Sequence, residues 1–276
     1  MKIWFQLISS EARVPHFFEA VRRQSRDAAG VGTEVTVRGT TNGGLFDQHA
    51  SLLQLDEVEL LNIASREVAQ RGYSVYAMAN CLDPALDGLR EILDVPVVSL
   101  MEAGCFVASL VGDRFGVIAP NSKMRYRIAD LLGARGYEHK LAGITSLQFD
   151  HVPDMDKMFT DRSVADNVIQ ALADNAEELV ASGAEVILIP GPVASLVARE
   201  KIQSLHGAVV LDMYAALINV AEGVGRLVSS TGLQTSRAGR YAAPPAAAVA
   251  SAFTQLSSEI RAVATGGGFG TSVEDR

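Results

Sequence analysis

Short apolar runs alternate along this chain with longer segments of helical periodicity, and no other sequence feature limits the possible folds as strongly. Runs rich in apolar and β-branched residues predict strands at 3–8, 34–37, 75–79, 95–100, 116–119, 141–146, 186–189 and 208–211. Segments with a single apolar stripe predict helices at 15–28, 57–72, 122–136, 164–183 and 214–232. Strands that are joined through helices pair in parallel, so we expect an α/β fold with mostly parallel sheets.

The composition is typical of a globular protein that acts on small molecules. The 276 residues, 48% of them hydrophobic, suffice for one large or two small α/β units. The net charge of −8 argues against nucleic acid or a membrane surface as partner, because both require a cationic footprint. No apolar run reaches the roughly 20 residues of a membrane helix, and no signal-peptide pattern is present. A cytoplasmic protein with a small-molecule substrate is therefore expected.

The cysteine content excludes further classes of site. Cys81 and Cys105 are too few for a disulfide framework, and no Cys/His cluster has the spacing of a metal site. Cys105 lies among apolar residues on a predicted helix and is interpreted as a core residue.

Two segments of the chain share one pattern. Residues 72–92 and 183–202 each begin with a glycine that ends a helix, continue as an apolar strand and a tight turn, and enter a new helix. Two halves of similar build would place their strand-end turns opposite each other, where ligands of open α/β sheets bind. Any two βα units also look alike, so the pattern alone leaves both interpretations open.

The turn after the predicted strand at 75–79 is a candidate site. Asp83 suits a helix N-cap, and Pro84 suits the first helical position. A thiol on such a turn lies near backbone N–H groups and the positive end of a helix dipole, which lower the pKa of a thiol. Cys81 is therefore either a reactive thiolate or a small buried side chain. Glu102, in the next helix, is likewise either a capping carboxylate or a ligand-binding one.

Several stretches of the sequence resemble a known family. They are DPALDGLRE at 83–91, VPVVSLMEAG at 95–104, FGVIAPNS at 115–122, KIWFQLISSE at 2–11, VVLDM at 209–213 and TSRAGRYAAPP at 235–245. In this order they are similar to the aspartate/glutamate/hydantoin racemase superfamily, and most to its hydantoin and allantoin racemase branch. The resemblance covers nearly the whole chain.

The resemblance implies two Rossmann-like subdomains related by a pseudo-twofold axis, with a small carboxylate or cyclic imide in the cleft between them. We expect residues 1–98 and 212–265 to form the first subdomain and residues 99–211 the second. In such enzymes one thiol on each strand-end turn flanks the substrate carbon; one removes a proton and the other returns a proton to the opposite face. The resemblance implies that no metal or organic cofactor is required.

This sequence departs from the two-thiol pattern at both turns. Gly191 stands where the second thiol is expected, so no side chain there can carry a proton. Gly191 lies eight residues after Gly183, and the position eight residues after Gly72 is Asn80 rather than Cys81. A racemase that uses two thiols is therefore not expected.

Three functions are compatible with this departure. Cys81 can act alone as acid, base or nucleophile in a decarboxylation, an isomerisation or an amide hydrolysis. Alternatively, polar groups such as Asn80 bind the substrate while water or another group reacts, or the cleft only binds a ligand. We expect a cofactor-independent enzyme for a small carboxylate, amide or cyclic imide, with Cys81 and Asn80 as candidate catalytic residues. A simple racemase and a non-catalytic binding protein are the alternatives.

Polar groups near other predicted strand ends are candidates for substrate binding. Gln6 and Ser9 end the first strand, and Asn121 and Ser122 end the fifth, where Ser122 also suits a helix N-cap. At the second turn, Gly191, Pro192 and Val193 are candidates because backbone N–H groups can form an oxyanion-type nest, although Pro192 removes one donor.

Three other segments have less defined roles. Residues 39–55 are rich in Gly, Thr and Asn and form either a lid or a plain loop; their His49 is a candidate for the missing acid or base. Residues 149–163 are interpreted as an insertion between a strand and a helix. The Ala-rich helix predicted at 245–264 suggests packing against a second subunit in a homo-oligomer, and residues 266–276 are expected to be disordered.

Overall fold

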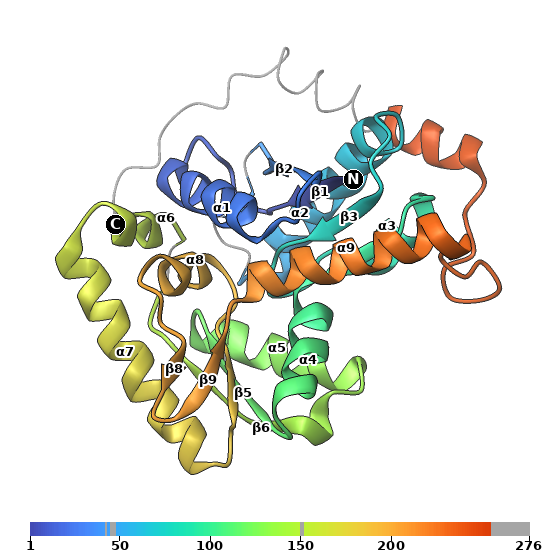
Figure 1. Ribbon diagram of the computed structural model, residues 1–276. Helices are drawn as coiled ribbons and strands as arrows, with labels where there is room; N and C mark the ends of the chain where they lie inside the picture. The colour runs from blue at the N-terminus through green and yellow to red at the C-terminus, as the bar shows by residue number, and fades with distance from the viewer. Residues whose placement is uncertain (42, 45–47, 150–151, 255–276) are drawn as a thin grey trace.

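The computed structural model describes residues 1–41, 43–44, 48–149 and 152–254 as two α/β units that lie side by side (Figure 1). The first unit contains a four-stranded sheet in the order β2-β1-β3-β4, in which every neighbouring pair is parallel. Its strands are β1 (Lys2–Gln6), β2 (Glu34–Arg38), β3 (Val75–Met78) and β4 (Val97–Ser99).

The second unit contains a five-stranded sheet in the order β6-β5-β7-β9-β8. Only the short edge strand β8 is antiparallel to its neighbour. The expected α/β fold with mostly parallel sheets is thus confirmed. The strands are β5 (Phe115–Ala119), β6 (Leu141–Ser146), β7 (Val186–Leu188), β8 (Ser204–Leu205) and β9 (Ala208–Leu211).

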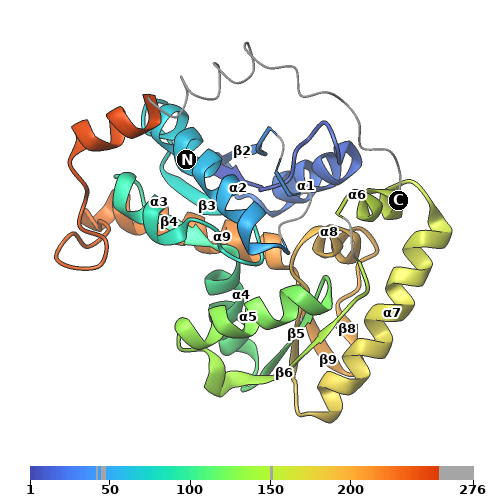
Figure 2. The same ribbon diagram turned by 180° about the vertical axis from the view of Figure 1, so that it is seen from behind.

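Helices cover both faces of each sheet; α9 crosses the first sheet in Figure 1, and α5 packs on β5 and β6 on the side seen in Figure 2. The α-helices are α1 (Pro15–Ala28), α2 (Ala50–Ile63), α3 (Leu86–Ile92), α4 (Leu100–Val111), α5 (Ser122–Ala134), α6 (Val152–Asp156), α7 (Arg162–Ala181), α8 (Pro192–Arg199) and α9 (Met213–Thr231). A π-helical turn at Ala64–Val68 extends α2, and 3-10 turns occur at Glu138–Lys140 and Lys157–Phe159.

Two predicted boundaries were wrong. The helix predicted at 57–72 begins at Ala50, so the end of the predicted loop at 39–55 is helical. The helix predicted to start at Pro84 begins at Leu86, because Asp83 and Ala85 both have a positive φ and interrupt the helical path. Asp83 therefore does not cap the helix that follows it.

Alternating side chains of the central strands enter two different cores. In β1, Ile3 and Phe5 face a cluster that contains residues of α1 and α9, whereas Trp4 faces a cluster with α2 and α3. The first of these clusters continues into the second unit, where it contains Phe115 and Val186. One apolar core thus joins the two sheets, while a third cluster packs α7 and α8 on the far face of the second sheet.

The chain crosses between the two sheets twice, and each crossing is a helix N-cap. β4 ends at Ser99, whose hydroxyl accepts a hydrogen bond from the N–H of Glu102 in the first turn of α4. β9 leads to Asp212, whose carboxylate accepts from the N–H of Ala215 in α9. Because caps stabilise the start of a helix, these two residues define where the chain passes from one sheet to the other.

The segment predicted as an insertion at 149–163 connects the two units. The N-cap position of α1 is Val14, which has no side-chain acceptor. Asp156 of the second unit supplies one: its carboxylate accepts from the backbone N–H of Phe17 at 2.8 Å and lies 2.8 Å from Nδ1 of His16. A residue 139 positions away thus caps α1.

We predict that Asp156→Ala lowers the free energy of unfolding by about 1–2 kcal/mol, the usual cost of a lost N-cap. Chemical denaturation measures this change. Asp154→Ala is the matched control, because Asp154 is an exposed residue of the same helix with a surface ion pair to Lys157 and should change stability little. Equal losses in the two variants would contradict the capping role.

Residues after α9 return to the first unit. Arg237 donates hydrogen bonds to the backbone carbonyl groups of Arg90, Glu91 and Leu93, around the end of α3. Residues 246–254 are helical, as expected for the Ala-rich segment. Residues 266–276, predicted to be disordered, lie outside the described residues, and the subdomain boundaries stay predictions. Within the described ranges, no helix has the length and apolarity to span a membrane.

Candidate functional site

The carboxyl ends of the central strands from both sheets meet at a small enclosed cavity of about 30 Å³. Ser9 follows β1, Asn80 and Cys81 follow β3, Asn121 follows β5 and Gly191 follows β7. Parallel strands present their carboxyl ends at one edge, and here two such edges face each other. The other lining residues are Gln48, Pro120, Met124, Phe149, Met155 and Pro192.

The turn after β3 places Asn80 and Cys81 at this cavity. The side-chain oxygen of Asn80 accepts from the N–H of Leu82 at 2.9 Å, and its carbonyl accepts from the N–H of Asp83, which closes a tight turn. Cys81 is 2% exposed and lies close to Tyr214. Burial, and then the electrostatic effects of Cys81 and Asp212, hold the pKa of the Tyr214 hydroxyl well above its usual value.

The turn after β7 has a conformation that only glycine adopts readily. Gly191 has φ 85° and ψ −163°, in a region that side chains exclude. A Cβ at this position would meet only Cγ of Pro120, at 3.7 Å. The cavity therefore has room for a side chain at this position, but the backbone conformation does not favour one.

Ser9 and Asn121 complete the polar lining. Ser9 is 7% exposed, and its hydroxyl has no hydrogen-bond partner within the described part of the chain. The backbone of Gly44 packs so closely on Ser9 that a Cβ there would lie 2.6 Å from Cα of Ser9. The Asn121 side chain accepts from the N–H of Met124 and donates to the carbonyl of Phe149, so Asn121 orients the cavity wall. Ser9 thus offers a hydroxyl group to a ligand in the cavity.

Three candidates from the sequence do not line the cavity with their side chains. Gln6 is fully buried; it accepts from Trp4 and donates to the carbonyl of Leu7, so its amide is occupied. Ser122 is exposed, because Asn121 rather than Ser122 is the N-cap of α5. Val193 packs into the core around α7 and α8. Its backbone N–H and that of Gly191 have no acceptor among the described residues.

Glu102 and His49 also do not line the cavity. Glu102 forms an ion pair with Arg90 at 2.5 Å, which explains its charge without a ligand. His49 precedes α2, and its Nδ1 lies 2.8 Å from Nζ of Lys123 on α5 of the other unit. His49 therefore links the two units beside the cavity, while its neighbour Gln48 lines it. Sequence reasoning missed Gln48, Phe149 and Met155, which no periodic pattern marks.

The two remaining titratable groups near the β3 turn are both buried. Cys105 is fully buried, as expected for a core residue, and burial raises the pKa of its thiol. Burial also raises the pKa of Asp83 to about 7, although its carboxylate accepts from the hydroxyl of Ser99 at 2.6 Å and from the N–H of Met101. Asp83 thus ties the β3 turn to the crossing into α4. No cluster of His, Cys, Asp and Glu suited to a metal occurs within the described ranges.

We predict that Gly191→Ala lowers the free energy of unfolding by about 1–3 kcal/mol, because alanine must adopt a strained backbone conformation there. Gly223→Ala in α9 is the control, since a Cβ at that helical position meets nothing within 4 Å and should be neutral or stabilising. Thermal or chemical unfolding of both variants measures the difference. A fully stable Gly191→Ala protein would show that the turn accepts a side chain.

We predict that the ionisation of Asp83 lowers the free energy of unfolding as the pH rises from about 4 to 7. The folded state holds the Asp83 proton up to a pKa of about 7, whereas the unfolded chain releases it near 3.8, so the folded state binds more protons between these values. Asp83→Asn keeps the hydrogen-bonding shape without ionising. Its advantage over the natural protein should grow across this range, by on the order of 2–4 kcal/mol. Denaturation at several pH values measures it.

The exposed Asp130 of α5 supplies the control for this series. Asp130→Asn should leave the pH dependence of unfolding unchanged. A parallel pH dependence in the natural protein and Asp83→Asn would contradict the assignment to Asp83.

The chain is similar to known proteins over most of its length. Residues 12–221 match the family model described as Asp/Glu/Hydantoin racemase. The hydantoin racemase of Paenarthrobacter aurescens is 26% identical over 233 residues, which cover 82% of this chain and 91% of that protein. The allantoin racemase structure from Pseudomonas fluorescens matches with a TM-score of 0.75 and 22% identity, covering 88% of this chain and 97% of that one. The allantoin racemase from Klebsiella pneumoniae matches with a TM-score of 0.70 and 21% identity, over 89% and 94% of the two chains.

Proposed function

Because the chain belongs to the Asp/Glu/hydantoin racemase family, we propose that it is an isomerase that inverts a carbon next to a carbonyl group in a small hydantoin-like ring or carboxylate. The observation that carries this proposal is the cavity in which Cys81, after β3, lies together with the Gly191 turn after β7. The 26% identity to a hydantoin racemase supports the choice of substrate class.

In the proposed reaction Cys81 is the acid and base on one face of the substrate. Its thiolate removes the proton from the carbon, so that the C–H bond breaks, an S–H bond forms, and the electron pair moves onto the carbonyl oxygen as an enolate. Return of the proton from Cys81 restores the original configuration. Proton transfers of this kind need no metal or organic cofactor.

Inversion requires a proton from the opposite face, where Gly191 carries no side chain. We assign this step to water: its O–H bond breaks as the new C–H bond forms, which leaves hydroxide on the Gly191 face. After the product leaves, the Cys81 thiol returns its proton to solvent, where that proton neutralises the hydroxide, so both groups regain their starting states. Water is a weaker acid than a second thiol would be, so exchange of the proton at the Cys81 face is expected to be faster than inversion.

The backbone around α8 suits the charge that develops on the enolate. The N–H groups of Gly191 and Val193 lack acceptors within the described residues and lie at the positive end of α8. The Ser9 hydroxyl adds a donor at the end of β1. These groups are our candidates for binding the substrate carbonyl or carboxylate.

The volume of the strand-end cavity is too small for a hydantoin or carboxylate substrate. Its volume of about 30 Å³ accommodates one or two water molecules, whereas small-molecule sites usually have 300–1,000 Å³. We therefore infer that the two units separate to admit substrate. The contacts of Asp156 with α1 and of His49 with Lys123 both span this boundary.

A second candidate reaction follows from the single thiol in the cavity. Decarboxylation of a malonate-type acid breaks a C–C bond, releases carbon dioxide and leaves the same enolate, which needs one proton from one face only. Cys81 alone suffices for that step. Hydrolysis of an amide is less compatible, because the similar protein of Paenarthrobacter aurescens is a racemase and not a hydrolase.

We predict that the protein catalyses deuterium uptake at C5 of 5-substituted hydantoins in heavy water, and that Cys81→Ala lowers this rate about 10²–10⁴-fold. Nuclear magnetic resonance measures exchange, and chiral chromatography measures inversion in the same samples. Cys105→Ala is the control, since Cys105 is buried away from the cavity and its loss should leave the rate within severalfold.

The other outcomes separate the candidates. Release of carbon dioxide from substituted malonates without exchange on hydantoins would support the decarboxylase. Full activity of Cys81→Ala would exclude Cys81 as the proton carrier. Binding without any turnover of hydantoins, carboxylates or malonates would support the non-catalytic alternative and reject both reactions.

A further inference from the structure

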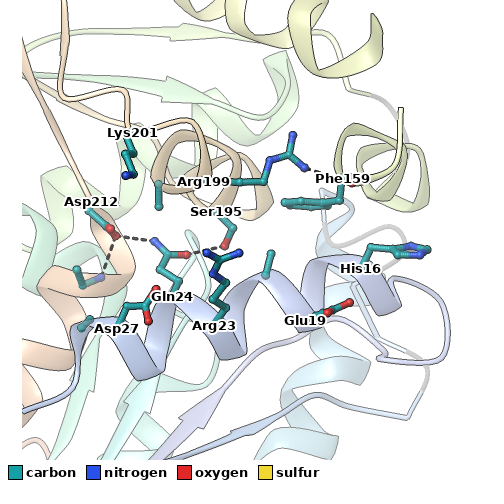
Figure 3. Close-up of a pocket in the computed structure, with 14 residues that line it drawn as sticks. His16, Glu19, Arg23, Gln24, Asp27, Phe159, Ser195, Arg199, Lys201 and Asp212 are labelled. Atoms are coloured by element: carbon teal, nitrogen blue, oxygen red, sulfur yellow. Dashed lines mark hydrogen bonds between the residues drawn. The ribbon is translucent and has the colours of Figure 1, made fainter. Parts of the chain in front are cut away.

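A second and larger cavity, of about 470 Å³, lies between α1 of the first unit and α8 of the second (Figure 3). Its floor reaches Asp212, where the chain crosses from β9 into α9. It is separate from the strand-end cavity, and no residue lines both. Its volume lies within the range of small-molecule binding sites.

Buried polar side chains form the floor of this groove, as Figure 3 shows. Ser195 of α8, 2% exposed, donates its hydroxyl hydrogen to the amide oxygen of Gln24, which is 8% exposed. The Gln24 amide donates in turn to Oδ1 of Asp212 at 2.6 Å. Oδ1 of Asp212 also accepts from the N–H of Ala215, whereas no described residue donates to Oδ2. Asp212 is half-buried at the end of this series of hydrogen bonds, so its Oδ2 can accept a hydrogen bond from a ligand in the groove.

Two cations, Arg23 and Lys201, line the groove and form no ion pair with any residue that the structure describes. Arg23 has Glu19 and Asp27 one helical turn before and after it, yet no ion pair with either is present among the described residues. Figure 3 shows the reason: the Arg23 side chain extends from α1 toward α8, and Lys201 enters from the opposite wall. Arg199 is different, because it stacks on Phe159 and donates to backbone carbonyl groups.

We propose that this groove is a second binding site, which takes a small zwitterion of the α-amino acid class. Arg23 and Lys201 hold the carboxylate through charge-assisted hydrogen bonds. Oδ2 of Asp212 accepts from the ammonium group, whose charge the neighbouring Asp27 also favours. The carboxylates of Asp27 and Asp212 would repel a simple anion, and Arg23 would repel a simple cation. A ligand that carries both charges therefore fits best.

Occupancy of the groove braces the two units against each other. Arg23 belongs to the first unit and Lys201 to the second, and α8 begins at Gly191–Pro192, which line the strand-end cavity. A ligand held by both walls opposes separation of the units. The bound zwitterion therefore slows the opening that exposes Cys81.

The test is a panel of the twenty L-amino acids, screened against the full chain by thermal shift and then by isothermal titration calorimetry. At least one should raise the melting temperature and bind, and Arg23→Ala should weaken that binding tenfold or more. Arg26→Ala is the matched control, because Arg26 is an exposed arginine of the same helix outside the groove and should leave affinity unchanged. Ser9→Ala, in the other cavity, should also leave affinity unchanged.

Alkylation of Cys81 by iodoacetamide supplies a readout that does not depend on catalysis. The bound amino acid should slow alkylation in the natural protein at least threefold and have no effect in Arg23→Ala. The proposal is overturned if no amino acid binds, if Arg23→Ala binds as tightly as the natural protein, or if Ser9→Ala abolishes binding. Binding without slower alkylation overturns the bracing role.

Discussion

The two crossings between the sheets are the constraint on which the site depends. At Ser99 and at Asp212 the chain leaves one sheet and immediately enters a helix, with the crossing residue as N-cap. Buried side chains hold both crossings from outside: Asp83 accepts from Ser99, and Gln24 donates to Asp212. Caps stabilise the start of each helix, so these hydrogen bonds support the facing of the two strand-end edges together with the apolar core that joins the sheets.

The burial of the Asp83 carboxylate is energetically unfavourable, and the hydrogen bonds that Asp83 forms explain its presence. A fully buried carboxylate is expensive, and burial raises its pKa to about 7. The same carboxylate joins the turn that bears Cys81 to the start of α4, through Ser99 and Met101. An apolar residue at this position would remove the hydrogen bonds that join the turn to Ser99 and Met101. The unfavourable burial of Asp83 is therefore linked to a fixed position of Cys81 relative to the crossing at Ser99.

Sequence reasoning reached the fold and part of the site because both follow local patterns. Counting from the helix-ending glycines paired Asn80 with Gly191, and the structure places both at one cavity. Contacts between distant segments left no such pattern. The cap that Asp156 supplies to α1 joins residues 139 positions apart, and Gln6 looked available only because its hydrogen bonds to Trp4 and Leu7 are invisible in the sequence.

The turns after β3 and β7 both face the cavity, but their backbone conformations allow different side chains. Asn80 has a backbone conformation without positive φ, so the β3 turn tolerates an ordinary side chain, and Cys81 follows it directly. Gly191 lies between two prolines, whose rings restrict φ, and itself occupies a region closed to side chains. Placing a thiol there would require a different turn, not only a different residue. In the function that we propose, chemistry in this cavity is therefore one-sided: side-chain acid and base groups belong to the β3 turn, and the β7 turn contributes backbone N–H groups.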